Sequence, residues 1–458
     1  MRPRRWRRST HLVIGLVVLV LVAAVVGVTA VITSSRTSAR SALPDQPAAV
    51  TAEPGVRPLG EATTEPTRKG LTATLAAALA DPNLGALTGR VTDGVTGAEL
   101  WEQGEGIPMQ PASTNKVLTT AAALLTLDRD ATLTTRVLAG SRPGVVVLHG
   151  GGDPTLSAFE PGRRTWYKGA ARISDLAEQV RSSGTRVTAV QVDLGEYSGP
   201  TMAPGWDPLD IDGGDIAPIE SVMIDGGRTQ PTTVDSRRSR TPGLDAGRAL
   251  AAALGVDPAT VTVGSVSADA EELATVQSPP LIERLRQMMN DSDNVMAESI
   301  GREVAAALNR PQSFDGAVQA VLGQLRGAGI DTAKATLLDS SGLSVDNRLT
   351  ALTLDGVIAA AVGEDQPTLR PLVDLLPIAG GSGTLSNRYL DTTEGRASAG
   401  WLRAKTGSLT GTNTLAGIVT DASGRVLTFA LISNNAGPTG RTSLDALAAK
   451  LRSCGCGG

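Results

Sequence analysis

Histidine and cysteine are almost absent from this chain of 458 residues, which contains two of each. His11 borders a hydrophobic run near the N-terminus, so a Ser-His-Asp triad would have to be built on His149 alone. The two cysteines, Cys454 and Cys456, lie at the C-terminal end. Such a composition does not readily form a zinc site in a protein core. We therefore expect no bound metal, no other cofactor and no metallopeptidase.

The chain also lacks an excess of one charge. It has 42 basic and 46 acidic residues, which give a formal net charge of -4. No block of basic residues follows the first eight positions. Nucleic-acid binding is therefore not expected.

Three short motifs do stand out, in a fixed order along the chain. They are Ser113-Thr-Asn-Lys116, Ser292-Asp293-Asn294 and Lys405-Thr406-Gly407. The first supplies a serine nucleophile and, three residues later on the same helical face, a lysine that can act as its base. The second supplies a polar pair that can relay protons and orient a substrate, and the third supplies a cationic strand edge. Together they predict acyl transfer through a covalent serine ester, without a histidine.

The distribution of lysine supports this prediction. Arginine supplies most of the basic residues, and lysine occurs only at Lys69, Lys116, Lys168, Lys334, Lys405 and Lys450. Arginine does not lose its proton in proteins, so it could not replace Lys116 as a base. A neutral amine requires that the lysine pKa fall from about 10.4 to about 7. We expect partial burial and the second cation, Lys405, to cause this shift.

A long apolar segment lies near the N-terminus. Residues Leu12 to Ile32 carry no charge and follow five arginines within the first eight residues. About twenty residues at roughly 1.5 Å each span the hydrocarbon core of a bilayer. We therefore predict one N-terminal transmembrane helix, with the N-terminus in the cytoplasm and the remainder of the chain outside. A cleaved signal peptide, which normally has a shorter apolar region, is the alternative and would make the protein secreted.

Composition divides the rest of the chain. Residues from Thr33 to Lys69 are rich in Ser, Thr, Ala, Pro and Glu without a hydrophobic period, which predicts a tether. Strand and turn patterns dominate between the first and second motifs, which predicts an inserted lobe with one helix near Leu244–Leu254. Near the C-terminus, Trp401–Thr406, Thr414–Thr420 and Arg425–Ser433 predict antiparallel strands, followed by a helix over Ser443–Leu451. The expected architecture is α+β, with helices packed on an antiparallel sheet.

By these motifs the chain resembles the low-molecular-mass class C penicillin-binding proteins of the D-alanyl-D-alanine carboxypeptidase/endopeptidase type, over about residues 75–450. Other similar stretches are Gly150–Leu156, Ser198–Pro200, Pro204–Trp206, Ala217–Val222, Asp339–Ser344 and Leu376–Gly380. The resemblance implies a serine β-lactamase/transpeptidase-like domain with an inserted smaller lobe. It also implies that peptidoglycan stem peptides are the substrates, that β-lactams are covalent inhibitors, and that the protein acts in the bacterial cell envelope.

With this resemblance, the predicted organisation comprises six segments. They are the cytoplasmic end and membrane anchor or signal (1–33), a flexible linker (34–70), the first part of the transpeptidase-like domain (71–134), the inserted lobe (135–275), the second part of the domain (276–452) and a flexible tail (453–458).

The resemblance also assigns roles to the motif residues. Ser113 would attack the carbonyl of the penultimate D-alanine, Lys116 would take its proton, and Ser292 would pass a proton to the leaving nitrogen. Asn294 would hydrogen-bond the amide of the substrate. Residues expected to bind substrate, including the terminal carboxylate and the oxyanion, are Lys405, Thr406, Gly407 and Ser408, with the backbone N–H of Ser113 as the second oxyanion donor.

Two alternatives remain at this stage. A serine β-lactamase uses the same three elements, but class A enzymes add a glutamate within a Glu-x-x-Leu-Asn stretch, and none occurs between Asn294 and Lys405. A non-catalytic envelope-binding protein with a vestigial site would be expected to lack a motif residue, and none is missing. The sequence also has Val345 where related proteins often have arginine. It does not separate carboxypeptidase from endopeptidase action, nor does it indicate the oligomeric state.

Overall fold

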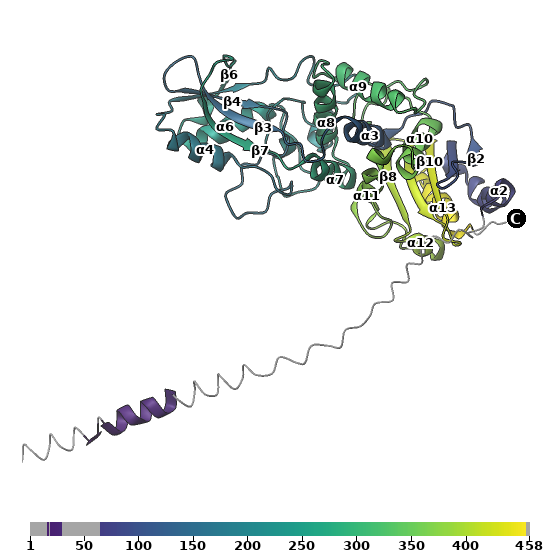
Figure 1. Cartoon of the computed structure of the whole chain (residues 1–458), viewed down its shortest axis with the longest axis horizontal. Coiled ribbons are helices and arrows are strands. Elements are labelled where there is room, and N and C mark those ends of the chain that lie inside the picture. The colour runs from purple at the N-terminus through teal and green to yellow at the C-terminus, as the bar shows by residue number, and fades with distance from the viewer. Residues whose placement is uncertain (1–15, 18, 30–64, 455–458) are drawn as a thin grey trace, which may run out of the picture. The chain divides into compact units, whose positions relative to one another are not determined.

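The computed structural model describes residues 16–17, 19–29 and 65–454, and the chain divides into two compact units, residues 1–60 and 61–458 (Figure 1). In the first unit, residues 16–17 and 19–29 are helical. No helix among the described residues is long and apolar enough to cross a membrane. The predicted transmembrane helix over Leu12–Ile32 is therefore wrong.

The physical reason is helix length. The continuous helical stretch at 19–29 extends about 16 Å, whereas a hydrocarbon core is about 30 Å thick. The rest of the apolar segment, the arginine-rich start and the predicted tether up to residue 64 lie outside the described residues.

The second unit is built on an antiparallel sheet of five strands. The strands are β1 (Ala86–Asp93), β2 (Glu99–Gln103), β8 (Leu402–Leu409), β9 (Thr412–Thr420) and β10 (Val426–Asn434). Their order in the sheet is β2-β1-β10-β9-β8, so that the first strand of the chain pairs with the last. This arrangement confirms the predicted antiparallel sheet and places β8 at its end, where the outer edge of Leu402–Ala404 is bonded to residues 377–379.

Helices cover both faces of this sheet because successive side chains of a strand point to opposite sides. On β10, Phe429 and Leu431 pack in one core with helices α2 (Arg68–Leu79) and α13 (Gly440–Ser453). The alternate residues, Ala430 and Ile432, pack in a second core with the helical layer on the other face. That layer comprises α3 (Lys116–Thr126), α7 (Leu281–Asp291), α8 (Asn294–Ala307), α9 (Phe314–Gly327), α10 (Ala351–Val362) and α11 (Pro371–Leu375), while α12 (Thr393–Ser398) packs on α13.

Helix α3 carries the first motif and lies deep in the helical layer. Every residue from Lys116 to Leu124 is buried. The Ala- and Leu-rich sequence of this helix has no polar face, which is typical of a helix enclosed on all sides. The first motif is therefore held by packing from α8, α9 and α10.

A second sheet lies in the segment between α3 and α7 (Figure 1). Its strands are β3 (Thr134–Ala139), β4 (Val145–Gly150), β5 (Ala189–Asp193), β6 (Thr262–Val263) and β7 (Glu272–Gln277), in the order β6-β5-β4-β3-β7. The β4–β5 and β5–β6 pairs are parallel and the others are antiparallel. We call residues 134–277 the inserted lobe.

Helices pack on the sheet of the inserted lobe. They are α4 (Ile173–Ser182) and α6 (Pro242–Leu254), and the lobe also contains the short α5 (Leu209–Gly213). Of these helices, the sequence pattern predicted only α6. It missed α4, although buried Ile173, Leu176, Ala177 and Val180 follow the i, i+3, i+4, i+7 pattern of an amphipathic helix.

Two predicted boundaries differ from the structure. Helix α2 begins at Arg68, inside the predicted linker, because Thr67 caps its N-terminus by accepting a hydrogen bond from the Gly70 N–H at 3.1 Å. At the other end, Cys454 is 1% exposed and packs in the core with α13, so the tail begins later than predicted. Residues 455–458 lie outside the described residues.

Candidate active site

Ser113 lies at the entrance to α3, in a short 3-10 helix that spans Ala112–Asn115. The preceding Ala112 has a φ of 45°, a left-handed conformation that non-glycine residues rarely adopt. Gly342, on a neighbouring loop, lies against the Ala112 carbonyl oxygen so closely that a Cβ atom at position 342 would collide with it. The strained turn before Ser113 is thus held in place by packing against Gly342.

Lys116 follows Ser113 by one helical turn and points back to it. Its Nζ donates hydrogen bonds to Ser113 Oγ at 2.9 Å, to Asn294 Oδ1 at 2.6 Å and to the Ser341 carbonyl oxygen at 2.8 Å. The side chain is fully buried. Three acceptors therefore fix the amine in contact with the serine oxygen, away from bulk solvent.

Burial also sets the protonation of this amine. It lowers the pKa of Lys116 to about 8, although the nearby carboxylates of Asp339, Asp293 and Glu298 act in the opposite direction. The sequence analysis expected the charge of Lys405 to contribute to this shift. In the structure it is the pKa of Lys405 that responds to the other lysine. Burial lowers the pKa of Lys405 well below its usual value, and the charge of Lys116 lowers it further. Both amines are thereby shifted toward the neutral form.

The second motif lies in the short connection between α7 and α8. Ser292 directly follows the last residue of α7 and has a φ of 56°. Its Oγ accepts a hydrogen bond from Lys405 Nζ at 2.9 Å. Asn294 begins α8, where its Oδ1 accepts from Lys116 and its Nδ2 donates to the Asp215 carbonyl oxygen at 3.0 Å. Each lysine is thus bonded to one residue of this motif.

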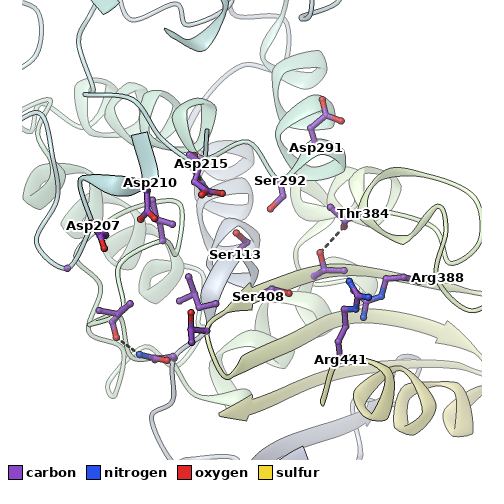
Figure 2. Close-up of a pocket in the computed structure, with 18 of the residues that line it drawn as sticks. Ser113, Asp207, Asp210, Asp215, Asp291, Ser292, Thr384, Arg388, Ser408 and Arg441 are labelled. Atoms are coloured by element: carbon purple, nitrogen blue, oxygen red, sulfur yellow. Dashed lines mark hydrogen bonds between the residues drawn. The ribbon is translucent and has the colours of Figure 1, made fainter. Parts of the chain in front are cut away.

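The third motif lies on the edge strand β8. Lys405 is fully buried, and its Nζ also donates to the Thr406 carbonyl oxygen at 2.8 Å. The hydroxyl groups of Thr406 and Thr384 are hydrogen-bonded at 2.8 Å (Figure 2). Gly407 lies against the start of the first motif, because a Cβ atom there would be 2.8 Å from the Pro111 carbonyl oxygen and 2.9 Å from the Ser113 nitrogen. Only a residue without a side chain lets the strand approach Ser113 this closely.

Replacing Gly407 with alanine should therefore slow acylation of Ser113 by up to about 100-fold, because a misplacement of about 1 Å costs this much. The new methyl group must displace the Ser113 backbone. The measurement is the second-order rate of labelling by a fluorescent penicillin. Gly323→Ala is the matched control, since nothing lies within 4 Å of a Cβ atom at that helical position. Equal rates for both variants and the wild type would contradict this view of Gly407.

All three motifs meet at one cavity of about 780 Å³, whose lining includes Ser113, Ser292, Asn294, Thr406 and Ser408. Charged side chains line both ends of the cavity. Figure 2 shows Asp207, Asp210 and Asp215 to one side of Ser113, and Arg388, Arg441 and Asp291 to the other, so one end is wholly acidic and the other carries the arginines. An extended substrate with a cationic group at one end and a carboxylate at the other matches this polarity.

The loop at 339–344 has a part in the site that the motifs did not reveal. Asp339 accepts hydrogen bonds from the N–H groups of Gly342 at 2.7 Å and Ser344 at 2.6 Å. Glu298 Oε1, on α8, accepts from the N–H groups of Ser340 and Ser341 at 3.0 and 2.8 Å. These two carboxylates hold the loop so that the Ser341 carbonyl reaches Lys116. The sequence of this loop resembles that of the penicillin-binding proteins. Its contact with Lys116 is made by a backbone carbonyl, however, and any residue type supplies a carbonyl, so the sequence does not indicate the contact.

No group of three or more His, Cys, Asp or Glu side chains in the described residues is arranged to hold a metal ion. A serine bonded to a buried lysine, a Ser-Asp-Asn turn and a Lys-Thr-Gly strand edge define an active-site serine acyl-transfer enzyme.

Comparison with known proteins identifies the family. Residues 71–237 and 232–451 match the D-Ala-D-Ala carboxypeptidase 3 (S13) family, and residues 1–58 match the carboxypeptidase Rv3627c-like N-terminal domain. The chain belongs to the S13 family. The predicted function, a serine-type D-Ala-D-Ala carboxypeptidase, is thereby confirmed.

Two relatives are similar over the whole length of both chains. Carboxypeptidase DacB of Mycolicibacterium smegmatis is 72% identical over 459 residues, with 100% of each chain covered. Carboxypeptidase Rv3627c of Mycobacterium tuberculosis is 63% identical over 460 residues, again with 100% of each chain covered.

A solved structure shares the fold. The crystal structure of penicillin-binding protein 4 (dacB) from Haemophilus influenzae has a TM-score of 0.67 and 23% identity, covering 84% of this chain and 98% of that chain. The same Haemophilus protein complexed with a β-lactam has a TM-score of 0.61 and 22% identity, covering 82% and 98%. The serine β-lactamase/transpeptidase-like fold predicted from the sequence is confirmed.

Proposed function

We propose that Ser113 is the nucleophile of this carboxypeptidase and that Lys116 is its general base. The observation that carries the proposal is the 2.9 Å contact between Lys116 Nζ and Ser113 Oγ at a fully buried lysine. When the amine is neutral, the same contact lets the serine hydroxyl donate its proton to nitrogen. His149, the histidine that a triad would need, is not among the residues that line the cavity.

Acylation of Ser113 by the proposed substrate proceeds as follows. Ser113 Oγ attacks the carbonyl carbon of the penultimate D-alanine as its proton passes to Lys116, and the N–H groups of Ser113 and Ser408 stabilise the oxyanion. Ser292 carries the proton from Lys116 on to the leaving nitrogen, the C–N bond breaks and D-alanine departs, which leaves Lys116 neutral and Ser292 protonated again. Ser292 is suited to this role because its hydroxyl is bonded to the second lysine, Lys405. Water then hydrolyses the ester and restores Ser113.

Substrate binding uses the remaining motif residues. Thr406 binds the terminal carboxylate at the end of the cavity that Arg388 and Arg441 line, and Lys405, which is buried behind the lining, supports this end through its bonds to Ser292 and the Thr406 carbonyl. Gly407 and Ser408 pair with the extended peptide along the edge of β8. Asn294 contributes one hydrogen atom of its Nδ2 group to a substrate carbonyl, because the Asp215 carbonyl occupies only the other.

The proposed substrates are peptidoglycan stem peptides that end in D-Ala-D-Ala, and β-lactams are the proposed covalent inhibitors. The family match and the β-lactam complex of the Haemophilus protein support both assignments. Because peptidoglycan lies outside the cytoplasmic membrane, we propose an extracytoplasmic location. Protease accessibility in intact spheroplasts tests the location, and protection of the protein would contradict it.

Incubation of the purified protein with muropeptides, followed by mass spectrometry, tests the activity. Release of free D-alanine from pentapeptides is the expected result, and cleavage of cross-linked dimers would add endopeptidase action. If neither product forms while the Ser113→Ala variant behaves identically, the proposed function is wrong.

The rate of acylation should depend on pH through Lys116. Only the neutral amine accepts a proton, and burial places its pKa at about 8. Below this pH the neutral fraction falls about tenfold per pH unit, so the rate should rise with pH and level off above about 8. Second-order labelling rates between about pH 6 and about pH 10 measure the profile. A rate independent of pH would exclude Lys116 as the titrating base.

A further inference from the structure

Asp293, the middle residue of the second motif, differs from its neighbours. Ser292 and Asn294 line the active-site cavity, but Asp293 does not, and it is 4% exposed. Its Oδ1 accepts a hydrogen bond from the Met296 N–H at 3.0 Å, which caps the N-terminus of α8. The cap uses only one of the two carboxylate oxygens.

The other oxygen is bonded by residues of the inserted lobe. Asp293 Oδ2 accepts hydrogen bonds from the Tyr167 hydroxyl at 2.7 Å and from Arg228 Nη2 at 3.4 Å. Arg228 Nη1 also donates to the Tyr167 hydroxyl oxygen at 2.9 Å, and its guanidinium lies 4.2 Å from the Trp166 ring centroid. Tyr167, Arg228 and Asp293 thus form a closed triangle, and all three are buried.

Charge reinforces this triangle. Although burial alone would raise it, the pKa of Asp293 is lowered to about 2 by Arg228 and Arg238, with support from the hydrogen bonds. The carboxylate therefore remains ionised, and its bonds to Tyr167 and Arg228 are charge-assisted, the strong kind of hydrogen bond.

Ser292 needs such support. Its φ of 56° lies in the left-handed region, where a serine is unusual, and it joins two helices without a glycine. The position of its hydroxyl beside Lys405 depends on this backbone conformation. The only side chain between Ser292 and α8 is that of Asp293, so an anchored Asp293 fixes the turn from its C-terminal side.

We propose that Tyr167 and Arg228 are positioning residues: through Asp293 they hold Ser292 in the left-handed conformation that places its hydroxyl beside Lys405. The inserted lobe is then a working part of the catalytic apparatus and not only an appended lobe. This inference rests on the proposed role of Ser292 in proton transfer.

Tyr167→Phe tests the proposal, since it removes one hydroxyl and keeps the ring. The rate constant of acylation by a labelled penicillin should fall about 10- to 100-fold, as for a small misplacement of a reacting group, while the dissociation constant of the non-covalent complex changes little. Tyr197→Phe is the matched control. Tyr197 also lies in the lobe, donates to a carbonyl at Gly152 and has an arginine, Arg302, over its ring, but it does not contact Asp293. Its acylation rate should stay within about twofold of wild type.

A double-mutant cycle separates positioning from a general loss of stability. In a Ser292→Ala background, Tyr167→Phe should cause little further loss, because the group it positions is gone. An equal fractional loss in both backgrounds would overturn the proposal. If Tyr167→Phe does not fold, Arg228→Lys provides the second variant, with the same expected fall in rate.

The proposed function and this inference can fail separately. Wild-type protein that is labelled at Ser113, together with a Tyr167→Phe variant as fast as wild type, would refute only the positioning role. Absence of labelling at Ser113 in the wild type would refute the proposed mechanism itself.

Discussion

Replacement of Ser113 by alanine should abolish covalent labelling by penicillin and the release of D-alanine. The structure places the Ser113 hydroxyl 2.9 Å from the amine of Lys116 and next to Gly407 on the edge strand β8. Loss of the nucleophile in a serine hydrolase lowers kcat by about 10⁶-fold. The fold should persist, because the Asn294 and Ser341 oxygens still accept hydrogen bonds from Lys116.

Mass spectrometry of the intact protein after incubation with penicillin measures this effect, and peptide mapping locates the adduct. Ser433→Ala is the matched control, since Ser433 is also buried and hydrogen-bonded, at 2.7 Å to the Leu84 carbonyl, but does not line the cavity. An adduct on another residue, or activity that EDTA abolishes and zinc restores, would contradict a serine mechanism.

The second large effect is expected for Lys116→Arg, which keeps a positive charge but removes the base. A guanidinium stays protonated in proteins, so it cannot take the proton of Ser113. General-base catalysis contributes about 10²- to 10⁴-fold, and acylation should fall by at least that factor. Because Lys116 is fully buried and enclosed by three acceptors, the larger side chain should also lower the melting temperature.

Labelling rates and thermal melts are therefore measured together. The control is Lys334→Arg, where the residue is exposed and its amine donates a hydrogen bond to the Gly106 carbonyl at 3.0 Å. A folded Lys116→Arg protein with a near-normal rate would show that this lysine supplies charge alone, and the base would then have to be another group.

Contacts in this site between residues close together in the sequence were predictable, and those between distant segments were not. The contact between Ser113 and Lys116 is local, since a spacing of three residues places both on one helical face. The Ser-Asp-Asn and Lys-Thr-Gly motifs were likewise recognised from residue type and order. The Ser341 carbonyl, the Glu298 carboxylate and the Tyr167–Arg228 pair come from distant segments, and nothing in residue type or spacing indicates them.

The errors have physical causes as well. The Leu12–Ile32 run has the composition of a membrane span, but composition does not state where a helix begins and ends. The pKa shift of Lys116 was expected in part from Lys405, whereas the structure attributes it to burial, and the charged groups that act on it are carboxylates. Burial is a property of the packed chain, so its magnitude could not be obtained from the motif alone.

The pairing of β1 with β10 has a consequence for when this enzyme becomes active. Leu87 lies opposite Ser433, and Asp93 is bonded to Arg425, although 332 residues separate that pair in the chain. β9 also comes from this late segment, and its Thr414 hydroxyl donates a hydrogen bond to the Pro111 carbonyl, close to Ser113. Such long-range pairing slows folding. A chain whose synthesis stops before the last strands therefore carries Ser113 but no assembled site, so hydrolytic activity begins only after nearly the whole polypeptide has been made.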